Sequence, residues 1–193
     1  MRVVAILLAA GSSRRFGGEK LLMPLRGRPL FEHALEALTA SPAGLETLAV
    51  VQPGFAAQPV RPRCRFVVNP DHAEGMGSSL RAGVRAAPGD ADAYLVALAD
   101  MPRITPGLIA SLIACYAAAG KQIVVPVHRG RRGHPVMMSR ELREPLLALT
   151  GDVGAREIIR AHPEWVGEFE TGDEAVLFDV DQPADLAAGE GGA

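Results

Sequence analysis

The chain contains two kinds of apolar segment. Short unbroken apolar runs predict strands buried on both faces, and apolar residues three or four positions apart predict amphipathic helices. One predicted strand begins at Val3, and the others cover residues 47–51, 64–68, 93–99, 122–127, 164–170 and 176–178. Predicted helices cover residues 30–38, 107–119 and 139–149, another runs from Ser78 or Ser79 to about Ala87, and a last one begins at Pro183. This alternation predicts an α/β fold, a single domain whose mostly parallel, twisted, Rossmann-like sheet carries helices on both faces.

Size and composition fit one compact domain. The chain has 193 residues, 48% of them hydrophobic, which suffices for one core. We expect a domain over residues 1–188 and a flexible tail over 189–193. A formal net charge of −2 gives no reason to expect nucleic-acid binding, and no apolar run reaches the length of a membrane span. Two cysteines without metal-ligand spacing and the lack of a signal-peptide pattern favour a cytoplasmic location.

The loop after the first strand combines glycines with cations. It contains Gly11, Gly17 and Gly18, and Arg14, Arg15 and Lys20. Glycine lets the backbone approach a ligand closely, and free amides together with cations bind anions, so we expect a polyphosphate here rather than a plain turn. The P-loop pattern fails because Leu21 follows Lys20, and the dinucleotide fingerprint fails because Ser13 replaces its second glycine. The second mismatch disfavours a nicotinamide-dependent reductase.

A second glycine-containing loop precedes the helix predicted to end near Ala87. Residues 69–83 contain Gly75 and Gly77, followed by Ser78 and Ser79, which suit a helix N-cap. A helix start offers N–H donors and the positive end of a dipole to a ligand. The alternative is an ordinary capped helix.

Three aspartates follow apolar segments. Asp100 stands at the end of the strand predicted at 93–99, where open α/β sheets place their ligands, and Pro102 restricts the following turn. Asp179 and Asp181 alternate along an extended segment, so their side chains point to one side. A helix beginning at Pro183 explains Asp181 as a cap but leaves Asp179 unexplained. Carboxylates without a His or Cys cluster favour Mg²⁺.

Two cationic loops follow further along the chain. Residues 128–136 hold three arginines and two histidines, and residues 150–156 read Thr-Gly-Asp-Val-Gly-Ala-Arg. The first loop is either a pocket wall for an anionic substrate or a solvated loop. The second again combines glycine-rich backbone with a guanidinium, which favours anion binding.

These motifs resemble those of nucleotidyltransferases with the glycosyltransferase-A-like fold (the nucleotide-diphospho-sugar transferase type). The family pattern is L-x-A-A/G-G-x-x-x-R-x-G-x-x-K. The residues that match it are Leu8, Ala9, Ala10, Gly11, Arg15, Gly17 and Lys20, if the position of the pattern's arginine may shift by one residue. The sequences R-G-H-P and G-D-x-G-A-R further resemble the molybdenum cofactor cytidylyltransferases. Gln182 departs from the family's usual threonine in the D-x-D-x-P-x-D-L end.

The resemblance implies a role for each group of residues. Catalysis would fall to Arg15, Lys20 and Asp100. Nucleotide would bind along Leu8, Ala9, Ala10, Gly11, Ser12, Arg14 and Lys20. Asp100 would lie at its phosphates, and Ser79, Ser78, Gly77 and Asn69 would lie at its base. Mg²⁺ would be held by Asp100 with Asp179, Asp181 or both. The acceptor substrate would meet Arg132, His134, Asp152 and Arg156.

The implied activity is the transfer of CMP from CTP to the terminal phosphate of Mo-molybdopterin, a pterin phosphate acceptor. The products are molybdopterin cytosine dinucleotide and pyrophosphate, with a molybdoenzyme as the recipient. The alternatives are a GTP-using guanylyltransferase, a cytidylyltransferase acting on another small phosphate, and a carrier or chaperone that binds nucleotide or molybdopterin without turnover. A carrier without turnover would need no pair of metal-binding carboxylates, so Asp100 together with Asp179 or Asp181 argues against this last alternative.

Overall fold

A computed structural model describes residues 1–11, 20–55, 62–152 and 154–190, with side chains to residue 186. Within this part of the chain, eight strands form one sheet and two short strands form a hairpin. The sheet contains β1 (Val3–Ala9), β4 (Glu46–Val51), β5 (Cys64–Val68), β6 (Ala93–Leu98), β7 (Ile123–His128), β8 (Arg131–Arg132), β9 (Val136–Ser139) and β10 (Val166–Glu170). The hairpin pairs β2 (Pro24–Leu25) with β3 (Arg28–Pro29).

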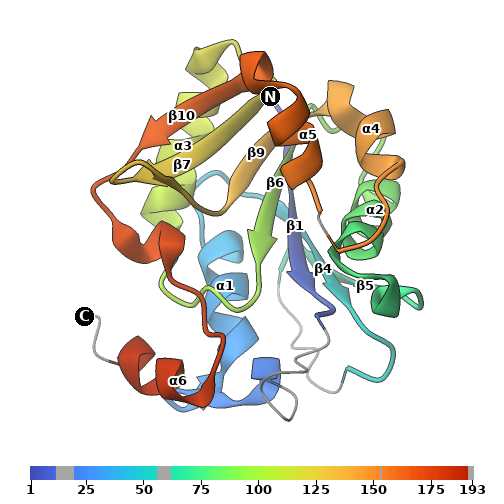
Figure 1. Ribbon diagram of the computed structural model, residues 1–193. Coiled ribbons are helices and arrows are strands. Elements are labelled where there is room, and N and C mark those ends of the chain that lie inside the picture. The colour runs from blue at the N-terminus through green and yellow to red at the C-terminus, as the bar shows by residue number, and fades with distance from the viewer. Residues whose placement is uncertain (12–19, 56–61, 153, 191–193) are drawn as a thin grey trace.

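The order and direction of the strands determine which loops lie together at one edge of the sheet. Along the sheet the order is β10-β7-β9-β6-β1-β4-β5, and β8 pairs with β7. The pairs β1–β4, β1–β6, β4–β5 and β7–β10 are parallel, whereas β9 runs antiparallel between β6 and β7. The predicted mostly parallel α/β fold is therefore confirmed. Strands β1, β4, β5 and β6 all end at the same edge (Figure 1), so the loops that follow them meet there.

Helices cover both faces of the sheet (Figure 1). In β1, Val3, Ala5 and Leu7 belong to one apolar cluster, and Val4 and Ile6 belong to the other, because alternate residues of a strand point to opposite faces. The first cluster contains α1 (Leu30–Thr39) and α3 (Pro106–Ala119), and the second contains α2 (Met76–Ala86), α4 (Arg143–Leu147) and α5 (Arg156–Ala161). This double burial is why β1 is apolar throughout.

One predicted element is shorter than expected, and another is wrong. The helix expected over 139–149 is confirmed over residues 140–147, as a 3₁₀ turn over Arg140–Leu142 followed by the short α4, whereas Ser139 ends β9, which runs antiparallel to both β6 and β7. The strand expected over 176–178 is instead the 3₁₀ helix η5 (Glu174–Leu177), which begins where the Asp173 side chain accepts a hydrogen bond from Ala175 N at 2.9 Å. This segment contains the buried residues Ala175 and Val176, and burial alone does not distinguish strand from helix.

Two element boundaries also differ from prediction. Helix α2 begins at Met76 rather than at the serines, and its N-cap is Gly75, which has a φ of 107° and no capping side chain. Ser78 and Ser79 therefore lie inside the first turn. Helix α6 (Pro183–Glu190) extends two residues past the expected end of the domain, and residues 191–193 lie outside the described residues. The division into domain and tail stays a prediction.

Candidate active site

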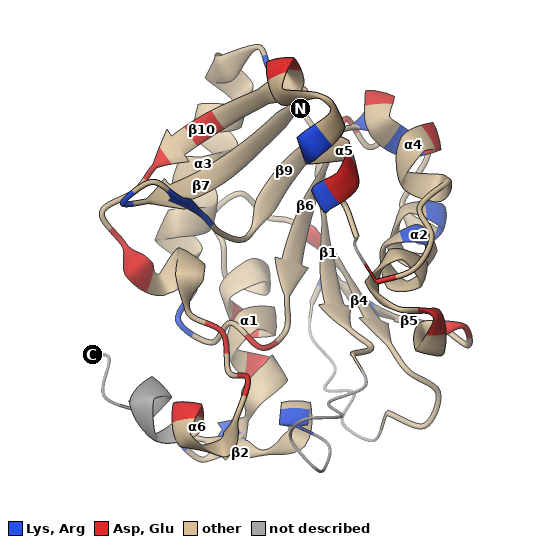
Figure 2. Ribbon diagram, viewed as in Figure 1, with Lys and Arg blue, Asp and Glu red and all other residues tan. Residues whose placement is uncertain are grey.

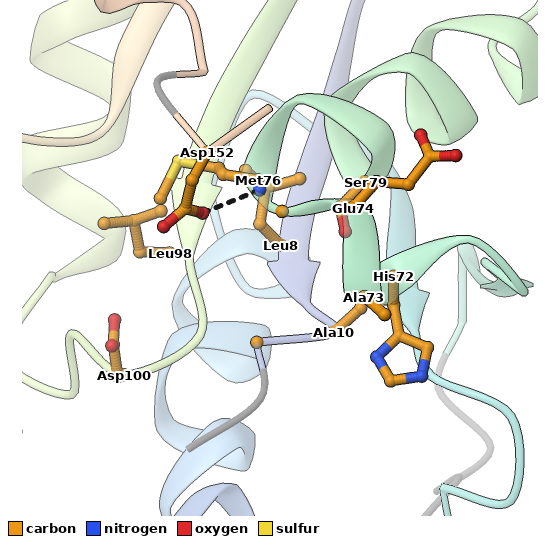
Figure 3. A pocket seen from close by; sticks show the side chains of 12 residues that line it. Leu8, Ala10, His72, Ala73, Glu74, Met76, Ser79, Leu98, Asp100 and Asp152 are labelled. Carbon is orange, nitrogen blue, oxygen red and sulfur yellow. Dashed lines mark hydrogen bonds between the residues drawn. The ribbon is translucent and has the colours of Figure 1, made fainter. Parts of the chain in front are cut away.

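A cavity of about 320 Å³ opens at the edge where β1 and β6 end. Figure 3 shows its wall, which is formed by residues from β1, β6, the loop before α2, α2 itself and the loop before α5. The lining residues are Leu8, Ala10, Gly11, His72, Ala73, Glu74, Gly75, Met76, Ser79, Leu98, Asp100 and Asp152. The structure thus brings together five of the predicted nucleotide-binding residues, Leu8, Ala10, Gly11, Ser79 and Asp100. Ala9, also predicted, is buried within β1 instead.

The three predicted metal ligands form a cluster. One carboxylate oxygen each of Asp100, Asp179 and Asp181 lies within 4.8 Å of the other two. The backbone explains this proximity, because Val180 N donates to Asp100 O at 3.0 Å and so ties the last segment to the end of β6. Partial burial, and then the charges of Asp181 and Asp100, raise the pKa of the Asp179 carboxyl above its ordinary value. These three carboxylates are therefore close enough to one another to hold a cation between them.

Lys20 supplies a positive charge to this cluster. Its Nζ donates to Asp100 Oδ2 at 2.7 Å and to the Val180 carbonyl at 2.6 Å, and it lies 3.8 Å from Asp181 Oδ1. Its side chain is only 11% exposed, so little water screens these contacts. The predicted phosphate-binding lysine is therefore held by two of the predicted metal ligands.

Asp181 does not cap the last helix. Asp185 Oδ2 accepts hydrogen bonds from the backbone N–H groups of Asp181 and Gln182, at 2.9 and 2.8 Å. Asp185 thereby closes the turn from within the helix, and the carboxylate of Asp181 stays in the acidic cluster. Sequence analysis missed Asp185, although an acid near the start of a helix is a known signal for this kind of bond.

The start of α2 contains a buried polar cluster. Asn69 Nδ2 donates to Ser78 Oγ at 2.9 Å and to Ser79 Oγ at 3.1 Å, and all three side chains are buried. Ser78 Oγ in turn donates to Gly75 O at 2.9 Å. Of the two serines predicted to read the base, only Ser79 lines the cavity. Asn69 holds Ser79 in place, and Ser78 lies beside it in the same cluster.

A second cavity, of about 380 Å³, adjoins the first. Leu8, Met76 and Leu98 line both. The rest of its wall is apolar except for Arg132, Gly133, His134, Arg156 and Arg160. Figure 2 shows basic segments on α5 and beside β7, and acidic segments in the stretch that leads to α6. Three predicted acceptor residues thus share one cavity, and Arg160 joins them, one helical turn after Arg156.

His134 is fixed in this wall and is uncharged at neutral pH. The backbone N–H of His134 donates to Val176 O at 2.9 Å, and the peptide bond between His134 and Pro135 is cis. Gly133 precedes it because a Cβ there would lie 2.0 Å from Val176 O. Burial, and then the charge of Arg156, lower the pKa of the His134 imidazole to about 4. Its Nδ1 is buried without a hydrogen-bond partner.

The fourth predicted acceptor residue, Asp152, lies at the first cavity instead. Its Oδ1 accepts a hydrogen bond from Met76 N at 3.0 Å, the dashed line in Figure 3. Gly77 N also donates to Gly151 O at 3.0 Å. Asp152 therefore joins the loop before α5 to the start of α2.

Some of the predicted site residues lie outside the part of the chain that the structure describes. Ser12, Arg14 and Arg15 lie within residues 12–19, outside the described part of the chain. Their assignments to the nucleotide stay predictions. None of the described helices has the length and apolar character that a membrane span requires.

Comparison with known proteins places the chain among nucleotidyltransferases. The profile of the MobA-like NTP transferase domain matches residues 5–165. The nicotine blue oxidoreductase of Paenarthrobacter nicotinovorans is 38% identical, over 93% of this chain and 92% of that protein. The molybdenum cofactor guanylyltransferase of Cereibacter sphaeroides is 30% identical, over 98% and 96%, and the molybdenum cofactor cytidylyltransferase of Escherichia coli is 20% identical, over 94% and 92%.

Solved structures share the fold over nearly the whole chain. A Mycobacterium sp. strain JC1 homologue of a Mycobacterium tuberculosis protein superimposes with a TM-score of 0.85 at 28% identity, over 98% of both chains. The Mycobacterium tuberculosis protein itself, in complex with manganese, superimposes with a TM-score of 0.81 at 21% identity, over 100% of this chain and 99% of that one.

Proposed function

This chain belongs to the family of MobA-like NTP transferase domains, and we propose that it transfers CMP from CTP to the terminal phosphate of Mo-molybdopterin, releasing pyrophosphate. Relatives named for cytidylyl and for guanylyl transfer to the molybdenum cofactor support this acceptor. A molybdoenzyme that receives the product and a cytoplasmic location belong to the same proposal.

The observation that carries the proposal is the acidic cluster beside the first cavity. Three carboxylates and a lysine meet where β1 and β6 end. Hard oxygen donors without a histidine or thiolate fit Mg²⁺ or Mn²⁺, and a protein with the same fold forms a complex with manganese. Asp100 would hold the ion together with Asp179, Asp181 or both. When bound, such an ion supplies Lewis acidity at the phosphates and neutralises their charge.

The chain's own residues supply positioning and charge. A phosphate monoester dianion is already a nucleophile at neutral pH, so the acceptor needs no general base. The main requirement is an in-line arrangement of acceptor phosphate, α-phosphorus and leaving pyrophosphate. Lys20 would exchange its carboxylate partners for the triphosphate, with Arg14 or Arg15 beside it, and so stabilise charge that develops on the leaving group.

The two cavities suit the two substrates. Ser79 lies at the wall of the first cavity with its Oγ bonded to Asn69, which fixes it for contact with a base. The second cavity combines an apolar wall with Arg132, Arg156 and Arg160 at its polar side. An apolar wall suits the face of a heterocycle, and guanidinium groups suit a phosphate. The shared residue Met76 would lie between the substrates.

The deciding experiment is a calorimetric titration of the purified protein with CTP and with GTP, each with and without Mg²⁺. Mg²⁺-dependent binding of CTP at least about tenfold tighter than that of GTP is expected. Tighter binding of GTP would move the protein to guanylyl transfer and remove the role of Ser79. Binding of neither nucleotide would overturn the proposal. Mo-molybdopterin and a sugar phosphate are then compared as acceptors by the release of pyrophosphate.

A redox activity is the second candidate, because a relative that is 38% identical is named an oxidoreductase. The acidic cluster disfavours it, since hydride transfer needs no group of three carboxylates. Incubation with NADH or NADPH and a quinone dye separates the candidates. Dye reduction without Mg²⁺, together with no release of pyrophosphate from CTP, would favour the redox activity. Nucleotide binding without either reaction would favour a carrier.

A further inference from the structure

We propose that Asp152 is a positioning residue: its carboxylate caps α2 from a distant loop and so holds Met76 and Ser79 in the walls of the two substrate cavities. This inference rests on the proposed function for its consequence but not for its geometry. It gives Asp152 a different role from direct contact with the acceptor.

Helix α2 lacks a cap of its own. Its N-cap residue is Gly75, and no side chain of the adjoining sequence bonds to the free N–H groups of the first turn. Such groups need partners, and a negative charge near them is also favoured by the helix dipole. Asp152 Oδ1 meets the first of these groups, Met76 N, at 3.0 Å. A residue 76 positions away therefore does what Ser, Asp or Asn normally does from the N-cap itself.

The two loops touch so closely that side chains are excluded between them. A Cβ on Gly75 would lie 2.8 Å from Asp152 Cα, and one on Gly77 would lie 2.9 Å from Gly151 O. Gly77 N also donates to Gly151 O at 3.0 Å. On the other side of the junction, a Cβ on Gly154 would lie 2.9 Å from Met76 Sδ. Backbone, carboxylate and thioether thus form one packed unit.

A second set of bonds fastens the same junction. Arg81, on α2, donates to Leu149 O and to Glu74 Oε2, the latter at 2.6 Å. Its side chain is 14% exposed. The loop before α2 and the loop before α5 are therefore held at both ends, and Asp152 provides the bond that directly faces the first cavity (Figure 3).

This junction lies between the substrates. Met76 lines both cavities, Ser79 and Asp152 line the first, and Ala155 and Arg156 line the second. Loss of the bond from Asp152 would release the first turn of α2. We expect weaker nucleotide binding and a poorer alignment of the acceptor, without any direct contact between Asp152 and either substrate.

Two substitutions separate positioning from direct contact. Asp152→Asn keeps an oxygen that can accept from Met76 N but removes the charge, whereas Asp152→Ala removes both. Loss of a helix cap costs ~1 kcal/mol, which corresponds to about a fivefold change in an equilibrium constant. We therefore expect Asp152→Ala to weaken CTP binding in the presence of Mg²⁺ about fivefold, and Asp152→Asn to remain close to the wild type. Ser139→Ala is the control, because Ser139 also caps a helical turn, the 3₁₀ turn after β9. Ser139 pairs with Ala93 at the start of β6, so it lies at the edge of the sheet opposite the cavity.

Hydrogen exchange measures the junction without any nucleotide. Amides at the start of α2 should exchange faster in Asp152→Ala than in the wild type, and Asp152→Asn should restore most of the protection. Unchanged exchange in both variants would overturn the inference, as would equal loss of CTP binding in both. If the wild type binds no nucleotide, the proposed function fails, while the exchange rates still decide whether Asp152 holds α2.

Discussion

Lys20 is bonded to the acidic cluster in this structure, and under the proposed function it would exchange these partners for a triphosphate. In this structure its ammonium group is bonded to Asp100 and to the Val180 carbonyl. A triphosphate carries more negative charge than one carboxylate and would attract it away. Binding of nucleotide and binding of metal are therefore expected to favour each other, since each leaves the other's ligands free.

Substitution Lys20→Met tests this exchange. Without the ammonium group, no charge competes for the carboxylates, so Mn²⁺ should bind to the nucleotide-free protein about tenfold more tightly, while nucleotidyl transfer is lost. Calorimetric titration with Mn²⁺ measures the first effect. Lys121→Met is the control, because Lys121 donates to Glu164 O, away from the acidic cluster. Unchanged Mn²⁺ affinity in Lys20→Met would contradict the exchange.

Asp100 is the member of the cluster nearest to Lys20, and its substitution tests the metal assignment. Asp100→Ala should reduce transfer by at least about a hundredfold, because the charge of the phosphates is no longer balanced in the transition state. The melting temperature should stay close to that of the wild type, since the Asp100 side chain is 23% exposed and lies at the end of a strand rather than in the core. Normal turnover in this variant would refute the role of the carboxylate.

At the scale of elements, the contact between α2 and the sheet sets the position of the site. Ser79 and Met76 stand at the start of this helix, and Gly83 stands where its later turns cross β1. A Cβ on Gly83 would lie 2.4 Å from Ile6 Cγ2 and 3.3 Å from Val50 Cγ2. The glycine therefore lets the helix approach the sheet closely enough for its first turn to reach the cavity.

Gly83→Ala tests that approach. The added methyl group would force α2 away from β1, and overpacking of this kind costs about 1–3 kcal/mol. Urea unfolding measures the loss of stability, and the affinity for nucleotide should fall as well because Ser79 shifts. The matched control is Gly107→Ala in the first turn of α3, where a Cβ meets nothing within 4 Å. Equal effects of the two substitutions would argue against the packing explanation.

At the scale of the whole molecule, His134 links stability to pH. The pKa of this imidazole falls from 6.5 to about 4 on folding. Between these values the unfolded chain binds a proton that the folded chain does not, so the free energy of unfolding decreases as the pH falls through this range. The full effect is on the order of 3 kcal/mol, and it is absent above the unfolded pKa.

Thermal unfolding at several pH values checks this effect. The melting temperature of the wild type should drop between about pH 7.5 and about pH 4.5, and His134→Asn should drop less because it has no imidazole to protonate. His162→Asn is the control, because His162 lies at the surface with a 40% exposed side chain. Equal slopes for His134→Asn and the wild type would show that other groups carry the pH dependence.

Much of the fold and site follows from local sequence. The apolar runs at β1, β4, β6 and β7 predict a buried parallel sheet, because the side chains on both faces of a covered strand are buried and therefore mostly apolar. Asp100 after β6 and Lys20 after β1 follow the same logic, since the ends of parallel strands gather at one edge. The sequence alone thus determined the α/β class and the edge of the sheet at which Asp100 and Lys20 stand together.

Tertiary structure decided what depends on contacts between distant segments. It turned the segment at Val136 into an antiparallel strand and the segment at Val176 into a 3₁₀ turn, because only neighbouring strands and loops settle the form of a short apolar run. It assigned the capping of α2 to Asp152, and the closing of the last turn to Asp185. Hydrogen bonds of a carboxylate depend on which N–H groups lie within about 3 Å of it, and residue order does not fix that distance when the partners are far apart in the chain.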